Sequence, residues 1–326
     1  MPASGPYTFR GTVQYFGMST LPLDIPAAVI DWIRNVFEQV NKRTATTLSR
    51  IPTMWETTLD QILISHLAEF SAPFRFPSNW VVTLDTHFLG GRIWGQWEIA
   101  DIGFLVVFRR AGKVVATKIA LLQSKRLYPD EVKVATDIHR IDYMVGFGRL
   151  LQSDGEYNNH VKQRTFTFSE QSKYQALDYG GEQYNEILNY TRKHGIPVHY
   201  QLYNPLLVPS SAELPASVDS TPTSSELQVG CRVVNAASLD TRLQSAGLRK
   251  LQNPSFSQIA GLANSLAADC WPLHYFVADL VLGCKEGHLA GTVPEPGEPL
   301  FAVFNQRTAP ISAAISININ APGEGG

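Results

Sequence analysis

Residues 97–127, WEIADIGFLVVFRRAGKVVATKIALLQSKRL, contain two long runs of apolar and β-branched residues separated by the short segment RRAGK. Such runs are typical of β-strands, and a glycine in a short polar segment favours a tight turn. Both runs are apolar at nearly every position away from their ends, which is typical of strands covered on both faces of a sheet. The stretch therefore predicts a hairpin at the centre of a sheet.

The register of this hairpin follows from its turn. With the turn centred on Gly112, opposed residues have numbers that sum to twice 112, and Asp101 and Gln123 meet this condition. Lys125 is two residues beyond Gln123 and shares its face, whereas Lys118 is an odd number of residues from Lys125 and faces the other way. We expect a carboxylate, an amide and an ammonium group to gather on otherwise apolar strands.

Polar groups in such a place need partners, because burying one without a hydrogen bond costs roughly 2–7 kcal/mol. Carboxylate and carbonyl oxygens are the ligands that Mg²⁺ prefers, and substrate phosphates commonly complete its shell. A lysine beside them can stabilise an anionic transition state or help orient an attacking water. The patch therefore favours phosphodiester hydrolysis.

An Asp on one strand of a hairpin, with Gln-x-Lys on the next, resembles the PD-(D/E)xK nuclease superfamily, which is restriction-endonuclease-like. The QxK form is similar to Mrr-type and antiphage-defence nucleases, which often carry a further Glu on the helix before the sheet; Glu56 in MWETTLDQIL fits. The resemblance covers residues 51–206. It implies a catalytic set of Glu56, Asp101, Gln123 and Lys125, with Glu56, Asp101, Gln123 and the main-chain carbonyl of Ser124 as ligands of Mg²⁺ or Mn²⁺.

The same resemblance implies contacts to the DNA backbone. Lys173 and Tyr174 lie near the start of a helix predicted over residues 169–195, broken or bent at Gly180-Gly181. Arg126 directly follows the catalytic lysine. Two departures from the superfamily pattern stand out. No proline precedes Asp101, and the separation from Asp101 to Gln123 is long, although the hairpin accounts for it.

Simpler interpretations exist for several of these residues. Gln123 and Lys125 can mark a strand that emerges into solvent, or Lys125 can form a structural salt bridge with Asp101. Thr53 and Glu56 have the spacing of a capping box, in which Glu56 serves the start of its helix. Packing of Tyr174 in the core is the alternative to a nucleic-acid contact.

Strands mixed with helices predict an α/β fold, with a restriction-endonuclease-like core of a central mixed sheet flanked by helices and an additional C-terminal α+β region. Apolar residues at helical spacing predict helices from about residue 24 and over about 54–70. The expected organisation is an N-terminal helical segment (1–50), a nuclease core (51–208), a Ser/Thr/Pro-rich linker or loop (209–227) and an α+β region of unknown role (228–326).

Composition limits the function classes. The formal net charge is −2, which argues against a broad basic nucleic-acid-coating face and favours local contacts or help from a partner. Three scattered cysteines without a CxxC pair favour a reducing interior, and no apolar stretch is long enough to span a bilayer, so a cytoplasmic protein is expected.

The function that follows from the resemblance is a Mg²⁺-dependent deoxyribonuclease acting on DNA, with double-stranded DNA favoured. It would work as a homodimer or within a larger antiphage-defence complex. The alternative is a nucleic-acid or nucleotide binding module that keeps the nuclease-like fold without turnover.

Overall fold

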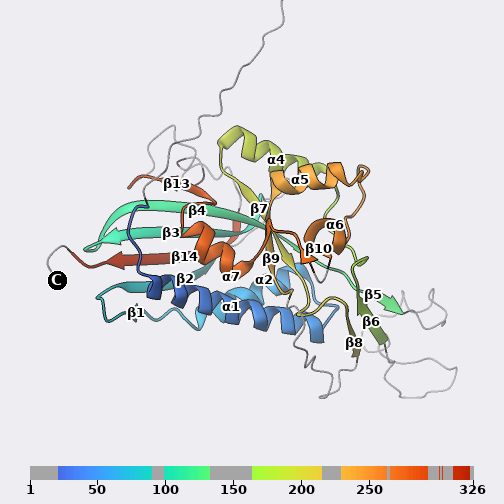
Figure 1. Ribbon diagram of the computed structural model, residues 1–326, viewed down its shortest axis with the longest axis horizontal. Coiled ribbons are helices and arrows are strands. Elements are labelled where there is room, and N and C mark those ends of the chain that lie inside the picture. Colours follow the sequence, from blue (N-terminus) through green and yellow to red (C-terminus); the bar gives the residue numbers. More distant parts are fainter. Residues whose placement is uncertain are drawn as a thin grey trace, which may run out of the picture.

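The computed structural model describes residues 21–89, 99–132, 164–214, 229–262, 265–292, 301, 303 and 311–323. Within these residues the chain forms a large mixed sheet flanked by helices (Figure 1). The predicted α/β class is therefore confirmed at this coarse level.

The predicted hairpin is formed by β3 (Ala100–Arg110) and β4 (Lys113–Arg126). The strands are antiparallel, and Ile102 pairs with Leu122, the predicted register. The register shifts by one between Phe108 and Arg109, at the turn end of the hairpin. Both turn residues have positive φ, 50° at Ala111 and 78° at Gly112, so the turn depends on the conformational freedom of Gly112.

The described strands of the main sheet follow the order β1-β2-β14-β3-β4-β7-β9-β12, and β13 pairs with the first part of β4. β14 is parallel to β3 and β7 is parallel to β4, while the other neighbours are antiparallel. The remaining strands are β1 (Phe74–Arg75), β2 (Val81–Phe88), β7 (Val198–Tyr203), β9 (Arg232–Asn235), β12 (Cys270–Pro272), β13 (His288–Ala290) and β14 (Ile311–Ala321).

The C-terminal strand β14 lies between β2 and β3, at the heart of the sheet. Its sequence ISAAISININA alternates, and Ala313, Ile315, Ile317, Ile319 and Ala321 are buried. Because β9, β12 and β13 also belong to this sheet, the stretch expected as an additional C-terminal region supplies four strands to the same sheet as the hairpin.

Two N-terminal helices, α1 (Ala27–Arg50) and α2 (Glu56–Ala68), lie beside each other (Figure 1). Both bury the apolar stripes predicted from helical spacing. The ring of Phe37 in α1 lies 5.7 Å from that of Phe104 in β3, and α2 bonds to the side chain of Ser124. Since Phe104 pairs with Ala120, an even number of residues before Ser124, α1 and α2 cover the same face of the sheet.

The opposite face carries α4 (Glu182–His194), because Gln183 bonds to Lys125, the residue after Ser124. Next to α4 lies α5 (Ala236–Ser245), joined to it by a 3.0 Å hydrogen bond from Tyr184 to Asp240 (Figure 1). The shorter helical elements are α6 (Phe256–Ala260), α7 (Leu273–Tyr275) and the π-helix η2 (Phe276–Val281).

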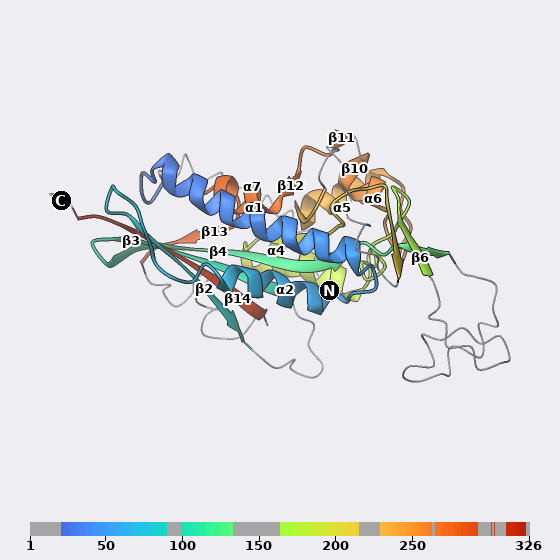
Figure 2. The same cartoon turned by 90° about the horizontal axis from the view of Figure 1, so that it is seen from below.

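A three-stranded sheet of β5 (Asp130–Val132), β6 (Arg164–Phe168) and β8 (Ser210–Leu214) lies at the end of the molecule away from the β3–β4 turn (Figure 2). A two-residue pair, β10 (Gly261–Leu262) and β11 (Ser265–Leu266), completes the described strands. The segment 209–227 was expected to be a linker or loop, but its first residues form the strand β8. β8 is an edge strand that buries only Ala212, and such a strand needs few apolar residues. Residues 215–228 lie outside the described residues.

The helix predicted over 169–195 is interrupted at Gly180-Gly181 as expected, and only the part from Glu182 onward is helical. Residues before it make turns, since Gly180 adopts a positive φ of 65° that interrupts a helix. In the part of the chain that the structure describes, no helix combines the length and apolar composition needed to cross a membrane.

Candidate functional site

Asp101 at the start of β3 meets the end of β4 as the register predicts. Its Oδ2 accepts a 2.7 Å hydrogen bond from the backbone N–H of Ser124 and another from Nε2 of Gln123. The other amide atom, Oε1 of Gln123, is buried without a hydrogen-bond partner among the described residues. The hairpin thus places a carboxylate against the Gln-Ser-Lys segment and leaves one amide oxygen unused.

Lys125 is 5% exposed and joins both helical layers. Its Nζ donates a 3.1 Å hydrogen bond to Oε1 of Gln183 in α4 and lies 4.0 Å from Oε2 of Glu56 in α2. Glu56 also accepts a 3.0 Å bond from the backbone N–H of Arg126. Burial raises the pKa of Glu56, an effect that the Lys125 charge opposes.

These contacts test two of the simpler interpretations. Gln123 and Lys125 are buried, so they do not mark a strand emerging into solvent. The capping-box interpretation of Thr53 and Glu56 is wrong, because α2 begins at Glu56 with Trp55 as its N-cap and no side-chain cap hydrogen bond. Glu56 instead turns its carboxylate to the end of β4.

Asp60, one helical turn after Glu56, is a member of the site that the sequence reasoning missed. Its Oδ1 accepts 2.6 and 2.7 Å hydrogen bonds from the hydroxyls of Ser124 and Tyr203. Burial, followed by repulsion from Asp101, raises the pKa of Asp60 to about 8. The signal for it was an acidic residue four positions after Glu56, inside the apolar stripe of α2.

Ser124 connects the two carboxylates, because its backbone bonds to Asp101 and its side chain to Asp60. The chain of bonds extends to β7, where Nε2 of Gln201 donates to the Tyr203 hydroxyl at 2.5 Å. Oε1 of Gln201 is buried and, like that of Gln123, lacks a hydrogen-bond partner among the described residues. The parallel pairing of β4 and β7 places Gln201 opposite Ser124, which the sequence did not reveal.

A cluster of three or more His, Cys, Asp or Glu side chains suited to a metal ion is not found among the described residues. The ligand set implied by the resemblance is of another kind, with two carboxylates, one amide and one main-chain carbonyl. These oxygen ligands fit Mg²⁺, and the Oε1 of Gln123, which lacks a hydrogen-bond partner among the described residues, could coordinate the cation. Repulsion of Asp60 by Asp101 and Glu56 is a further reason for a cation to be stable here.

Two of the expected nucleic-acid contacts are wrong. Tyr174 is fully buried and donates a 2.6 Å hydrogen bond to Asn204, so it packs in the core. Arg126 is also buried, bonded to the carbonyl of Pro52 and stacked over the ring of Tyr128. Lys173 is exposed, and its backbone pairs with Tyr128 just beyond the end of β4.

The residue before Glu56 has a property that sequence reasoning did not use. The side chain of Trp55 is 73% exposed, although an indole is mostly buried in folded proteins. The loop that carries it is held to β4 by the 3.0 Å bond from Arg126 to Pro52. An exposed aromatic residue therefore directly precedes Glu56 in a loop that is bonded to β4.

The comparisons with known proteins find no match. No protein-family model, curated protein or solved structure matches this chain.

Proposed function

We propose that this protein is a metal-dependent nuclease that hydrolyses phosphodiester bonds in DNA. The observation that carries the proposal is the meeting of Asp101 with Gln123 and Ser124 at the end of the hairpin. The next residue of that strand, Lys125, has its ammonium 4.0 Å from Glu56. An acid on one strand and Gln-x-Lys on the next is the pattern that resembles the PD-(D/E)xK superfamily. Burial of all three Gln-Ser-Lys side chains sets the site apart from a solvated surface cluster.

Glu56, Asp101, Gln123 and the main-chain carbonyl of Ser124 would hold Mg²⁺ or Mn²⁺. When bound, the ion would supply positive charge to the phosphate and to the attacking water. Gln123 presents Nε2 to Asp101, and a rotation of the amide would present Oε1 instead. The Oε1 of Gln123 and the carboxylate of Asp101 would then face each other, an arrangement that is stable with a cation between them. Binding of a cation would therefore explain why Oε1 is left without a hydrogen bond.

The chain's own residues have separable tasks. The Lys125 ammonium is held by Gln183 and Glu56 in a site that excludes most water, where its charge acts strongly on a developing anion. Asp60 and Tyr203 fix the Ser124 hydroxyl, and Ser124 in turn orients Asp101 through its N–H. Exposed Lys173 and Trp55 would serve as contacts for a phosphate and a nucleobase.

For the oligomeric state and the biological role, the proposal follows what the resemblance to the nuclease superfamily implies. With a net charge of −2, tight binding to DNA would need local cationic contacts, a second copy of the chain or another subunit. We propose a homodimer or a larger defence complex acting in the cytoplasm.

The test uses plasmid, linear duplex and single-stranded DNA, each with Mg²⁺, Mn²⁺ or EDTA. The wild-type protein is expected to cut at least one substrate with a divalent ion and none in EDTA. Asp101→Asn keeps an oxygen for the Ser124 N–H but removes the charge, so it is expected to fold, as checked by circular dichroism, and not to cut. Cleavage by Asp101→Asn at the wild-type rate contradicts the proposal.

A second candidate function is a nucleic-acid binding module without turnover. The observation that favours it is the hydrogen bond from the Gln123 amide to Asp101, because a neutral amide replaces a ligand charge and already satisfies the carboxylate. This alternative predicts DNA binding in EDTA, measured by fluorescence anisotropy, with no cleavage in Mg²⁺ or Mn²⁺.

A further inference from the structure

Two segments that are far apart in the sequence lie side by side next to α4. Residues 172–181 lead into α4, and residues 249–256 come after α5, which neighbours α4 (Figure 1). Hydrogen bonds join the two backbones, because the Tyr179 N–H donates to the Gln252 carbonyl at 3.1 Å and the Leu251 N–H donates to the Tyr179 carbonyl at 2.7 Å. The start of the second segment is therefore fixed against the segment that begins α4.

This pairing places a turn of the second segment at the end of α4 that belongs to the candidate site. A Cβ built on Gly180, just before the N-cap Gly181, would lie 3.4 Å from Cγ of Lys250. In the first turn of α4, Gln183 accepts the hydrogen bond from the Lys125 ammonium. The turn that carries Lys250 is thus at the same end of α4 as the proposed catalytic lysine.

The backbone of this turn has an unfavourable residue at its third position. The Gln252 N–H donates to the Arg249 carbonyl at 3.1 Å and closes a four-residue turn. Leu251 has a φ of 64°, which suits glycine and is rare for a bulky side chain. Its side chain is also 63% exposed, so burial does not offset the strain. Strained residues of this kind are typical of functional sites, and a partner that covers Leu251 would give it a role.

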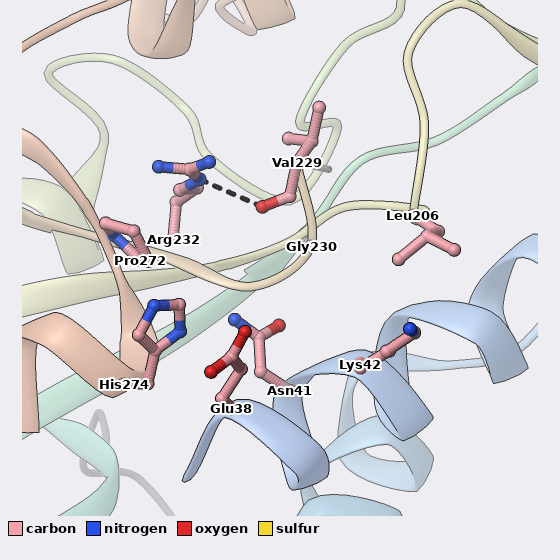
Figure 3. Close-up of a pocket in the computed structure, with 9 residues that line it drawn as sticks. All are labelled: Glu38, Asn41, Lys42, Leu206, Val229, Gly230, Arg232, Pro272 and His274. Atoms are coloured by element: carbon pink, nitrogen blue, oxygen red, sulfur yellow. Dashed lines mark hydrogen bonds between the residues drawn. The ribbon is translucent and has the colours of Figure 1, made fainter. Parts of the chain in front are cut away.

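The first half of the turn offers two cations to a partner. Arg249 and Lys250 are exposed, and in the part of the chain that the structure describes neither side chain has a hydrogen bond or an ion pair. Figure 3 shows the contrast with Arg232, which lines a pocket of about 280 Å³. The buried guanidinium of Arg232 donates to the carbonyls of Val229 at 2.9 Å and Cys270 at 3.5 Å. Arg232 is held by the protein itself, whereas the donors of the turn face solvent.

Charges nearby restrict where a polyanion can lie. Asp178 and Glu182 are exposed on the neighbouring segment and at the start of α4, and Asp178 accepts a 2.8 Å hydrogen bond from Asn253. These acids confine a polyanion to the tip of the turn. At the other end of the paired segments, exposed Lys173 adds a further cation, and its backbone bridges Ser255. Such local contacts agree with a net charge of −2 for the whole chain.

We infer that the turn of residues 249–252 is a contact surface for duplex DNA, with Arg249 and Lys250 at backbone phosphates and Leu251 against the base pairs. Phosphate oxygens accept from the solvent-facing donors, and an exposed leucine is the kind of side chain that wedges between stacked base steps. The inference rests on the proposed function. It gives part of residues 228–326, a region without a role so far, a share in binding the substrate.

The test measures binding of a labelled duplex by fluorescence anisotropy in EDTA over a range of salt concentrations. The double variant Arg249→Ala/Lys250→Ala is expected to bind about tenfold more weakly, with a slope of log K against log salt that is smaller by about 2. The matched control is Arg192→Ala/Lys193→Ala, which changes the same pair of residue types in the last turn of α4, at the opposite end of the helix. Its affinity and slope are expected to equal those of the wild type.

Leu251→Gly separates a DNA contact from a structural role. Glycine accepts the positive φ, so the variant is expected to raise the Tm by about 1–2 °C. Loss of the wedge is expected to weaken duplex binding about fivefold and to leave binding of single-stranded DNA unchanged, because a single strand has no stacked base pairs to enter. A residue with a structural role alone would not combine higher stability with lower affinity.

Equal affinities of the two double variants, or wild-type duplex affinity of Leu251→Gly, overturn the inference. If the wild-type protein then still cuts DNA with Mg²⁺ or Mn²⁺, the proposed function stands without this surface. A wild-type protein that neither binds nor cuts DNA removes both.

Discussion

Two buried lysines on β4 show what sets the candidate site apart. Lys118 is 1% exposed and Lys125 is 5% exposed, yet they lie on opposite faces of the strand, as their spacing predicts. Burial lowers the pKa of Lys118, against a hydrogen bond with Cys284 and the more distant charge of Glu286. Glu286 itself is already engaged, since it lies 2.9 Å from Nε2 of His199.

Lys125 instead contacts groups of the candidate site. It joins Glu56 and Gln183, and the next residues in the network are Ser124, Asp60 and Asp101. A buried lysine alone is therefore weak support for a site. The stronger sign is that three acids gather around one strand end: Glu56 at Lys125, Asp101 at Gln123 and Ser124, and Asp60 at Ser124, with an unused amide oxygen on Gln123.

The largest expected effect separates these two lysines by activity. Lys125→Met removes the ammonium from the acids and is expected to reduce Mg²⁺-dependent DNA cleavage by about 10²-fold or more. Lys118→Met has the same change in charge and volume on the other face and is expected to cut DNA at the wild-type rate. Both rates are measured on the substrate that the wild-type protein cuts best, with the folded state of each variant checked by circular dichroism.

Equal losses in the two variants would break the comparison, because they would point to a general requirement for a buried charge on β4. Retained cleavage in Lys125→Met would remove the lysine from the catalytic set.

The second effect concerns the acidic side of the site. The pKa of Asp60 rises from an ordinary 3.8 to about 8, so between these values the native state holds a proton that the unfolded state releases. The stability contributed by this proton is present at the acid end of the interval. It is lost as pH rises toward 8, by up to about 1.4 kcal/mol per pH unit.

Asp60→Asn removes this titration and keeps an oxygen for the hydroxyls of Ser124 and Tyr203. In urea unfolding with EDTA, the variant is expected to gain stability relative to the wild type as pH rises from 5 to 8, the interval in which native Asp60 keeps a proton that the unfolded state has released. Asp24→Asn, a change of an exposed carboxylate, is the control. A stability difference that stays constant with pH argues against a protonated Asp60.

A third effect tests the exposed aromatic ring. Trp55→Ala is expected to weaken binding of single-stranded DNA about tenfold, since stacking on one aromatic side chain contributes about 1–3 kcal/mol per base. Binding is measured by fluorescence anisotropy in EDTA. Leu251→Ala, at another exposed apolar residue, is expected to leave affinity unchanged; equal effects of the two changes contradict a specific stacking contact.

The smallest effect returns to Lys118. Because burial lowers its pKa below the ordinary 10.5, the native state releases a proton before the unfolded state does. Wild-type stability therefore gains as pH rises toward 10.5, and Lys118→Met lacks this gain. At neutral pH, Lys118→Met is expected to be more stable than the wild type by about 1 kcal/mol, because Met fills a similar volume at no desolvation cost. This difference in the free energy of unfolding, measured in urea, is expected to shrink as pH rises. A stability difference that stays constant or grows with pH contradicts a lowered pKa of Lys118.

The sequence by itself determined the β3–β4 hairpin and its register, and with them the meeting of Asp101 with Gln123 and Ser124. These are local consequences of one turn and of side-chain alternation along extended chain, so neighbours in sequence suffice to define them. The stripes of α1 and α2 were readable for the same reason.

The tertiary structure alone decided which distant segments share the sheet. β14 inserts between β2 and β3, although more than two hundred residues separate it from β3 in sequence. Its alternating pattern predicts a strand but does not indicate which strands it pairs with. The positions of Asp60 and Tyr203, and the burial of Tyr174 and Arg126, depend likewise on how helices and strands dock. Docking is chosen by competition among many apolar faces of similar quality, a choice that local spacing does not encode.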